Sequence, residues 1–445
     1  MTFEEAMTFV ERARSFPTAV SRVHPERFRA LLVATGLDVA LAKVPAIVVA
    51  GSAGKGSTTR MIAALARGVL DRVGDARSIV FGTKPPLRET DDGHRERYQS
   101  IGLGMRVPTW IPRERFAAHV AFLAPYVLEL EETQGPLAPF DVRYAVLARE
   151  AASCAAALVV VEANIGLRND VSRAWPNVAT TVLTHIGVEH GALLPAPDPQ
   201  PAVLAGLGAS AGPAWHKAGG VFAGRPVVVS TQRAEVLSAI TALARDAGAS
   251  YVEAASAAVD ESITLSVLGR YQRDNAATAL LAIDVLQREH ALPSAPIDLD
   301  RLANVRIPGR LELVARDPLT IRNVTEAPTK AIATLREISS APVRVVLTTI
   351  ERVEGSDEVV RIFARHPQLV RLYATRWHTS DAQRDMAPDR IAAIARQARP
   401  DLDVVIEPDA GRAIRRARAE ANEGETVLLI GDGLANAWEE QLSAS

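Results

Sequence analysis

Residues 44–58 read VPAIVVAGSAGKGST, and this stretch decides the fold. Residues 44–50 form an apolar, β-branched run, which predicts a buried strand. Residues 58–70 carry apolar side chains at helical spacing, which predicts a helix. A glycine-rich turn joins the two. The sequence therefore predicts a strand, a tight turn and a helix in direct succession.

The turn has the composition of a phosphate-binding loop. In such a turn the backbone N–H groups and the helix N-terminus face one concavity and can solvate phosphate oxygens. Lys55 is then placed to reach the terminal phosphates, and Ser57 offers a hydroxyl to Mg²⁺. The turn departs from the strict P-loop pattern, because Val49 occupies the first glycine position and Gly56 separates Lys55 from Ser57. We predict ATP and Mg²⁺ as ligands, the alternative being a glycine turn that binds nothing. The nucleotide-binding residues predicted here are Gly51, Ser52, Ala53, Gly54, Lys55, Gly56, Ser57 and Thr58.

The length, net charge and cysteine content of the chain exclude several classes of protein. A chain of 445 residues predicts two or three cores. A formal net charge of −2 disfavours nucleic acid or an anionic membrane as a partner. The only cysteine, Cys154, excludes an internal disulfide and fits a reducing compartment. No leader pattern opens the chain, and the longest apolar run, 155–161, is far short of the roughly 18 residues of a membrane span. We expect a cytoplasmic protein.

Lysine is rare in this chain. Only Lys43, Lys55, Lys84, Lys217 and Lys330 are present, and arginine supplies nearly all of the 50 basic residues. The imbalance is typical of a GC-rich genome. It nevertheless marks each remaining lysine as a position where an ammonium group can be required in place of a guanidinium.

Strand and helix patterns alternate along the rest of the chain. Buried-strand patterns at 157–162, 178–184 and 226–231 are separated by helical patterns such as 113–132 and 234–247. This alternation predicts a parallel sheet covered on both faces. Residues 193–212 are rich in proline, alanine and glycine, which is typical of a loop or mobile insert. We interpret them as a plain linker.

A second alternation follows the proline-rich link at 291–296. Its strand patterns lie at residues 319–323, 342–350, 369–374, 403–406 and 426–430. The fold class we predict is α/β. A P-loop-type, doubly wound and mostly parallel sheet domain spans residues 1–300, and a smaller Rossmann-like α/β domain spans residues 301–445.

The turn at 51–58 is the variant seen in the Mur ligase superfamily of ATP-dependent amide ligases. Further segments resemble the folylpolyglutamate synthase branch of that superfamily in the same order along the chain. The matching segments are 157–162 followed by Gly166, Arg168 and Asp170, then 182–190, 216–228, 271–279 and 308–312. The resemblance covers roughly residues 20–440 and implies the Mur ligase fold and reaction.

The resemblance implies roles for single residues. Glu162 and His190 match metal-binding positions, and Lys217 matches a lysine that becomes carbamylated and holds a second Mg²⁺. Asn275 belongs to a helix start that contacts adenine, and Arg310 belongs to the hinge before the last domain, where a guanidinium can clamp a phosphate. Both are predicted nucleotide-binding residues. The alternatives are a structural histidine at 190, an ordinary solvated lysine at 217 and a surface salt bridge at 310.

Elementary chemistry supports the metal set independently. A carboxylate at the end of one strand, Glu162, and an imidazole at the end of a neighbour, His190, point into the crevice where open α/β sheets bind ligands. With the Ser57 hydroxyl they form a mixed oxygen and nitrogen set that Mg²⁺ accepts when phosphates and water complete the octahedron. His185 and Glu189 are weaker candidates. The predicted metal ligands are Ser57, Glu162, His190 and Lys217, and the predicted catalytic residues are Lys55, Lys217 and His190.

Two segments depart from the family pattern. Lys84 and Pro86 stand where the family has a metal-holding serine and a histidine after a proline. Residues 323–328 read NVTEAP in place of the family's DGAHNP. We therefore expect the contacts that the last domain makes with nucleotide or amine to differ from the family's.

The predicted function is an ADP-forming, ATP-dependent ligase that joins a small-molecule carboxylate to an amino acid. A looser similarity, carried by residues 82–84 and 92–94, links the chain to the poly-γ-glutamate synthase branch. That branch implies the same reaction with another acceptor. Two further alternatives remain, a degenerate nucleotide-binding homologue acting as a scaffold and a P-loop phosphotransferase that forms no amide.

Overall fold

The structure is a computed structural model in which the chain forms two compact units. It describes residues 1–12, 25–83, 95–188, 194–256, 258–324, 332, 334–335, 341–349, 351, 355–376, 385–431, 434 and 437–438. Unit 1 comprises Met1–Pro85, Arg95–Ser266 and Tyr271–Arg306, and unit 2 contains Ile307–Ser445 together with Val267–Arg270. Within the described residues, no helix combines the length and the apolar character that a membrane crossing needs.

Unit 1 is built on a single sheet. Among the described residues eight strands form it, in the order β4-β3-β2-β5-β1-β6-β7-β8. The edge strands β3 and β4 pair antiparallel, whereas the strands from β2 to β8 pair in parallel. The bounds are β1 Ala46–Ala50, β2 Ile79–Gly82, β3 Tyr98–Ile101, β4 Thr109–Trp110, β5 Leu158–Glu162, β6 Val178–Leu183, β7 Val227–Val229 and β8 Val252–Ala254.

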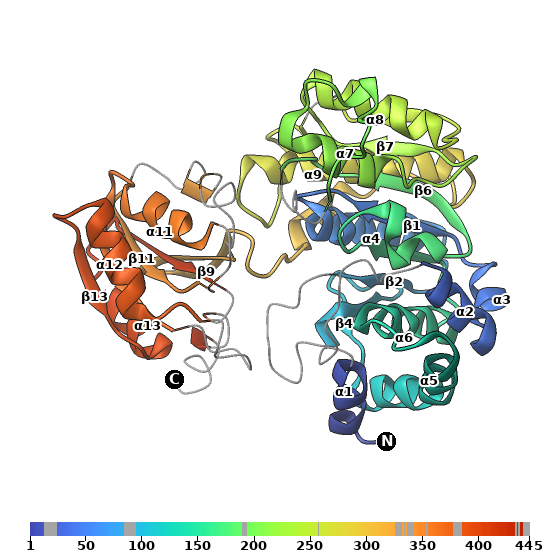
Figure 1. Ribbon diagram of the computed structural model, residues 1–445, viewed down its shortest axis with the longest axis horizontal. Helices are drawn as coiled ribbons and strands as arrows, with labels where there is room; N and C mark the ends of the chain where they lie inside the picture. The colour runs from blue at the N-terminus through green and yellow to red at the C-terminus, as the bar shows by residue number, and fades with distance from the viewer. Residues whose placement is uncertain are drawn as a thin grey trace. The chain divides into compact units, whose positions relative to one another are not determined.

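Helices cover both faces of this sheet (Figure 1). The α-helices of the region are α1 Phe3–Glu11, α2 Pro25–Thr35, α3 Leu37–Leu41, α4 Lys55–Arg72, α5 Arg113–Gln134, α6 Pro139–Ser153, α7 Ala211–Ala218, α8 Ala234–Asp246 and α9 Arg270–Arg288. Short 3₁₀ turns are η4 Leu167–Asn169, η5 Val171–Ala174, η6 Ala202–Leu204, η7 Gly208–Ser210 and η8 Leu299–Asn304.

The central strand β1 is buried on both faces, which explains why its sequence is continuously apolar. Ala46, Val48 and Ala50 belong to a core shared with helices α1–α3 and α5–α8. Successive side chains of a strand alternate between faces, so Ile47 and Val49 point to the opposite side. Helix α4 packs against β1, β2 and β5. The sheet therefore fixes the start of α4 at the carboxyl end of β1.

Unit 2 is a second, smaller α/β layer. Its described strands have the order β13-β12-β11-β14-β10-β9, and all pair in parallel except β9. The strands are β9 Glu312–Arg316, β10 Leu319–Asn323, β11 Val343–Leu347, β12 Leu369–Ala374, β13 Asp403–Ile406 and β14 Thr426–Ile430. The helices are α11 Ser356–Ala364, α12 Pro388–Ala398 and α13 Ala410–Ala419. Strand order reverses at β11, as in Rossmann-like sheets.

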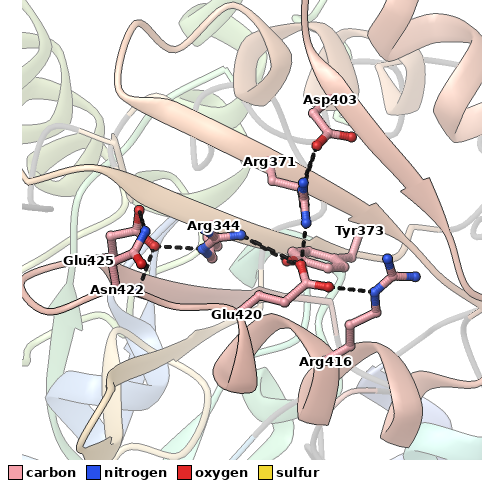
Figure 2. A network of polar contacts seen from close by, with 8 residues as sticks. All are labelled: Arg344, Arg371, Tyr373, Asp403, Arg416, Glu420, Asn422 and Glu425. Atoms are coloured by element: carbon pink, nitrogen blue, oxygen red, sulfur yellow. Dashed lines mark hydrogen bonds and ion pairs between the residues drawn. The ribbon is translucent and has the colours of Figure 1, made fainter.

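A polar network ties the amino ends of the unit 2 strands together (Figure 2). Arg344 of β11 donates from Nε to Glu425 at 2.6 Å and from one Nη to the Tyr373 hydroxyl at 3.1 Å. Tyr373 donates to Glu420 at 2.6 Å, and Arg371 bridges Glu420 and Asp403. Every charged group drawn has an opposite charge or a hydrogen-bond partner within the same cluster. The cluster is thus a stabilising element of unit 2.

The predicted α/β class with mostly parallel sheets is confirmed. The interpretation of residues 193–212 as a plain linker is wrong, because Leu204 and Leu207 are buried in the core of unit 1 and helix α7 begins at Ala211. Helix α6 was not predicted.

Candidate functional site

The glycine turn links β1 to α4 and is held from the side by the segment after β6. The N–H groups of Ser52 and Ala53 both donate to the carbonyl of His185, at 2.8 and 3.2 Å. Gly51 has φ +151°, and a Cβ placed there would lie 1.9 Å from Thr184 Oγ1. Only glycine permits both this conformation and this close approach. Gly51, which indicated a turn in the sequence, is therefore also required by the packing of this segment against Thr184.

The turn presents hydrogen-bond donors at the start of α4. Gly54 caps the helix in the left-handed region, and the Thr58 N–H donates to its carbonyl at 2.9 Å. The N–H groups before Thr58 have no acceptor inside the helix, and the helix dipole adds partial positive charge. Lys55 Nζ donates to the Gly51 carbonyl at 3.0 Å, so the ammonium lies over the same turn. The arrangement suits an anion with several oxygens.

Asn275 lies against this turn. A Cβ placed on Gly54 would lie 2.4 Å from Asn275 Oδ1, which means that helix α9 brings the asparagine directly onto the loop. Asn275 Nδ2 donates to Gln272 Oε1 at 2.9 Å, and both side chains are buried. The structure thus brings together two segments that the sequence separates by more than 200 residues.

Glu162 ends β5 at the same edge of the sheet. It is in register with Val49 of β1, and the Ala163 N–H donates to the Val49 carbonyl at 2.9 Å. Neighbouring strands lie about 4.8 Å apart, so Glu162 is close to the entrance of the glycine turn. Its carbonyl accepts a hydrogen bond from the Tyr144 hydroxyl of α6, and the residue is 6% exposed.

The predicted metal set cannot be assembled in full. His190, Glu189 and Lys84 lie outside the described residues. Among the residues that are described, no group of three or more His, Cys, Asp or Glu side chains is arranged to hold a metal ion. Ser57 and Glu162 supply a hydroxyl and a carboxylate, the hard oxygen donors that Mg²⁺ binds together with phosphate and water. The donor set present therefore fits Mg²⁺ held jointly with a nucleotide.

The turn after Glu162 is fixed by Asp170, which accepts from the N–H groups of Asn164 and Ser172 at 2.9 and 3.0 Å. Arg168 in this turn donates to the Trp215 carbonyl at 2.9 Å and stacks on its ring at 3.7 Å. These contacts attach α7, which carries Lys217. The Lys217 side chain is fully buried, so it is not an ordinary solvated lysine.

A pocket opens beside Glu162 at the carboxyl ends of β2 and β5. Its cavity volume is about 30 Å³, and it is half open to solvent. Its walls combine apolar and aromatic side chains with two guanidinium groups and an amide. The lining residues are Gly82, Thr83, Arg97, Tyr98, Phe140, Arg143, Tyr144, Leu147, Glu162 and Asn164. Sequence analysis gave a site role only to Glu162 and cited Gly82 and Thr83 only for a family similarity, because the lining comes from four separate segments of the chain.

Two of the pocket's polar groups define its chemistry. Asn164 is 8% exposed, and neither its amide nitrogen nor its amide oxygen bonds to another described residue. Arg143 forms an ion pair with Glu11 and lies 5.3 Å from the Phe140 ring centroid. A buried amide without a protein partner is costly and points to a ligand or water. We call this cavity the β5 pocket.

Arg310 and Asn323 belong to unit 2. Arg310 donates to the carbonyls of Gly309 and Val324 at 3.3 and 3.2 Å. Asn323 accepts from the Leu311 N–H at 3.1 Å and donates to Thr334. The residue that replaces the family's aspartate thus has a structural role in joining β10 to its neighbours.

Comparisons with known proteins agree with this geometry. No family model matches the sequence. A probable bifunctional folylpolyglutamate synthase/dihydropteroate synthase of Haloferax volcanii is 25% identical over 448 aligned positions, which cover 97% of this chain and 49% of that protein. The chain thus spans about half the length of this curated relative.

Solved structures match over the whole chain. The folylpolyglutamate synthase of Mycobacterium tuberculosis complexed with ADP superposes with a TM-score of 0.76 at 18% identity, covering 100% of this chain and 98% of that one. The chain has the folylpolyglutamate synthase fold. A bifunctional folylpolyglutamate synthase/dihydrofolate synthase of Yersinia pestis, complexed with AMPPNP and a manganese ion, superposes with a TM-score of 0.71 at 18% identity, covering 100% and 98%.

The folylpolyglutamate synthase fold accounts for the two-unit architecture seen here. The resemblance read from short motifs in the sequence is confirmed at the level of the fold.

Proposed function

We propose that this chain is an ATP-dependent, ADP-forming ligase of the cytoplasm that joins a small-molecule carboxylate to the amine of an amino acid. The observation that carries the proposal is the convergence of three groups at one sheet edge. These are the donor-rich turn with Lys55, the amide of Asn275 on Gly54, and the Glu162 carboxylate beside β1. Nucleotides are bound by the solved structures that share the fold.

The glycine turn binds the triphosphate of ATP. The N–H groups at the start of α4 donate to phosphate oxygens, and Lys55 exchanges its bond to the Gly51 carbonyl for one to the terminal phosphates. Asn275, next to Gly54, borders the nucleotide. Because these donors are preorganised by β1, α4 and the His185 carbonyl, little reorganisation accompanies binding.

Ser57 and Glu162 hold Mg²⁺ together with the phosphates. The bound ion would neutralise part of the negative charge on the transferred phosphoryl group. We assign Lys217 to this site as well, and its side chain is buried. A carbamylated Lys217 would contribute an anion for a second ion, which the unmodified ammonium cannot do.

The β5 pocket binds the carboxylate substrate. It adjoins Glu162, and its aromatic wall suits an apolar body while Arg97 and Asn164 suit polar substituents. A substrate oxygen then attacks the γ-phosphorus, ADP leaves, and an acyl phosphate forms. The neutral amine of the amino acid attacks the acyl carbon, phosphate leaves, and the amine loses a proton. Positioning and charge neutralisation carry most of the rate enhancement.

The decisive experiment measures ADP and phosphate release with ATP·Mg²⁺ and panels of acids and amino acids, together with mass spectrometry of the products. Folates and γ-glutamyl compounds are tested as acceptors. Which of them is extended distinguishes the folylpolyglutamate synthase branch from the poly-γ-glutamate synthase branch, a choice that the sequence left open. ADP release must require both the acid and the amine. Release of AMP, or hydrolysis with no amide product, would contradict the proposal.

Lys55→Ala tests the role of the turn. It should lower turnover at least about 100-fold, because an interaction with the transferred phosphoryl group is lost. Lys43→Ala is the matched control, since Lys43 is an exposed lysine of the same unit outside the turn. Equal turnover of Lys55→Ala and Lys43→Ala would show that Lys55 has no role in the site.

A further inference from the structure

Two buried amide side chains meet near the start of helix α9. Gln272 is fully buried, and Asn275 is 6% exposed. Asn275 Nδ2 donates to Gln272 Oε1 at 2.9 Å. An amide has a donor end and an acceptor end, and this contact uses the donor end of Asn275. It therefore fixes which way the Asn275 amide is turned, and its acceptor atom, Oδ1, lies on the other side.

The acceptor end of Asn275 faces the glycine turn. A Cβ placed on Gly54 would lie 2.4 Å from Asn275 Oδ1 but 3.5 Å from Asn275 Nδ2, so the oxygen is the atom nearer to the turn. The Cα–H groups of a glycine are weak hydrogen-bond donors, which suit an oxygen at this place better than an NH₂ group. Asn275 thus presents an acceptor, not a donor, beside the turn to which we assign the nucleotide.

The burial of Gln272 carries a cost that packing does not explain. Its Nε2 is buried and has no hydrogen-bond partner among the described residues. A buried donor without a partner destabilises the fold, and a methionine of similar size would avoid that cost. What glutamine provides and methionine cannot is the Oε1 acceptor that binds Asn275. The glutamine is therefore suited to orienting Asn275.

We infer that Gln272 is a positioning residue, which holds Asn275 Oδ1 toward the nucleotide and so selects a purine with an amino group at C6. Phosphate oxygens only accept hydrogen bonds, so an amide oxygen cannot bind them. Ribose hydroxyls donate and accept, so either end of an amide would serve them. The C6 amino group of adenine donates, whereas the C6 oxygen of a 6-oxopurine accepts. A fixed amide orientation decides binding only for this last pair.

The inference rests on the proposed nucleotide site and adds the part of the nucleotide that Asn275 reads. The experiment is isothermal titration of the full chain with Mg²⁺ and the β,γ-imido analogues of ATP and ITP. The wild-type protein should bind the adenosine analogue about tenfold more tightly, because in the inosine complex two acceptors would face each other. Gln272→Met should reduce this preference to less than about threefold, since the Asn275 amide can then turn either end to the base.

Two further variants show whether the effect acts through Asn275. Gln287→Met is the matched control, because it makes the same substitution in the same helix, where Gln287 Nε2 donates to the carbonyls of Pro293 and Ala295. It should keep the tenfold preference. Gln272→Met combined with Asn275→Asp should regain a preference for the adenosine analogue, because both oxygens of a carboxylate accept. A preference compares two ligands of one variant, so a loss of affinity common to both ligands does not change it.

Three outcomes would overturn the inference. Equal binding of both analogues by the wild-type protein would assign Asn275 Oδ1 to another group of the nucleotide, with the proposed function intact. An unchanged preference in Gln272→Met, or the same loss in Gln287→Met, would mean that Gln272 does not orient Asn275. Binding of neither analogue would contradict the proposed function together with this inference.

Discussion

Each unit of this protein has a polar cluster at the ends of its strands. The two clusters differ in whether protein partners satisfy their charged and hydrogen-bonding groups. At the carboxyl edge of unit 1, the glycine turn exposes donors that the helix cannot satisfy, and Lys55 bonds only a backbone carbonyl among the described residues. At the amino edge of unit 2, the groups of Figure 2 satisfy one another. A polar group aimed at space suggests a ligand, whereas a closed network suggests stability.

The largest effect is expected from Gly51→Ala. The new Cβ would lie 1.9 Å from Thr184 Oγ1 at φ +151°, so the turn must move away from β6. We expect loss of the thermal stabilisation by ATP·Mg²⁺ and a destabilisation of about 3 kcal/mol or more. Differential scanning fluorimetry with and without nucleotide measures both.

Gly36→Ala is the matched control for that variant. Gly36 also has a positive φ, +69°, but a Cβ there meets nothing within 4 Å. It should cost only about 1 kcal/mol of backbone strain and leave the nucleotide-dependent shift intact. If both alanine variants keep the shift, the close approach at Gly51 does not control nucleotide binding.

The second prediction breaks the closed network. Arg344→Leu leaves Glu425, whose side chain is 9% exposed, without its guanidinium partner. We expect unit 2 to lose about 3 kcal/mol of unfolding free energy, with the nucleotide-dependent shift of unit 1 unchanged. Chemical denaturation measures the loss.

Arg390→Leu is the control for Arg344→Leu. Arg390 pairs with Glu351 and Asp357, but its side chain is 49% exposed, so solvent screens these ion pairs and the substitution should change the unfolding free energy much less than Arg344→Leu. Equal effects of the two substitutions would show that burial does not distinguish the network from ordinary surface pairs.

The third prediction concerns pH and has opposite signs in the two units. In unit 1, burial raises the pKa of Asp141 to about 7, against a hydrogen bond from the Ala138 N–H that lowers it. The folded state therefore holds a proton that the unfolded state has released, and stability falls as pH rises from about 4 to 7. Asp141→Asn should remove about 2 kcal/mol of this pH dependence.

Urea denaturation at pH 5 and pH 8 measures that difference. The asparagine oxygen can still accept from the Ala138 N–H, so the start of α6 is kept. From pH 5 to pH 8, the unfolding free energy of the wild-type protein should fall more than that of the Asp141→Asn variant. A parallel pH dependence in both proteins would place the pKa of Asp141 near its ordinary value.

Sequence alone predicted the parts of the fold that repeat a local pattern. The β1 turn, the end of β5 at Glu162 and the helix with Asn275 are local signals, and the structure has a strand or helix at each. The β5 pocket was not predicted, because it is assembled from residues far apart in the chain.

The smallest predicted effect sharpens the description of the unit 2 network. Desolvation opposes ionisation of Glu420, but hydrogen bonds from Arg416, Tyr373 and Arg371 lower its pKa to about 2. Because the pKa of Glu420 in the folded state lies below its value in the unfolded state, the stability from its ionised form is present above about pH 4.5 and is lost as pH falls toward 2.

Tyr373→Phe removes the hydroxyl that donates to Glu420 at 2.6 Å and accepts from Arg344. The loss should be about 1 kcal/mol at pH 7 and smaller at pH 2, where Glu420 takes up its proton. Denaturation at both pH values measures it, and an equal loss at pH 7 and pH 2 would mean that the hydroxyl acts through packing rather than through the charge of Glu420.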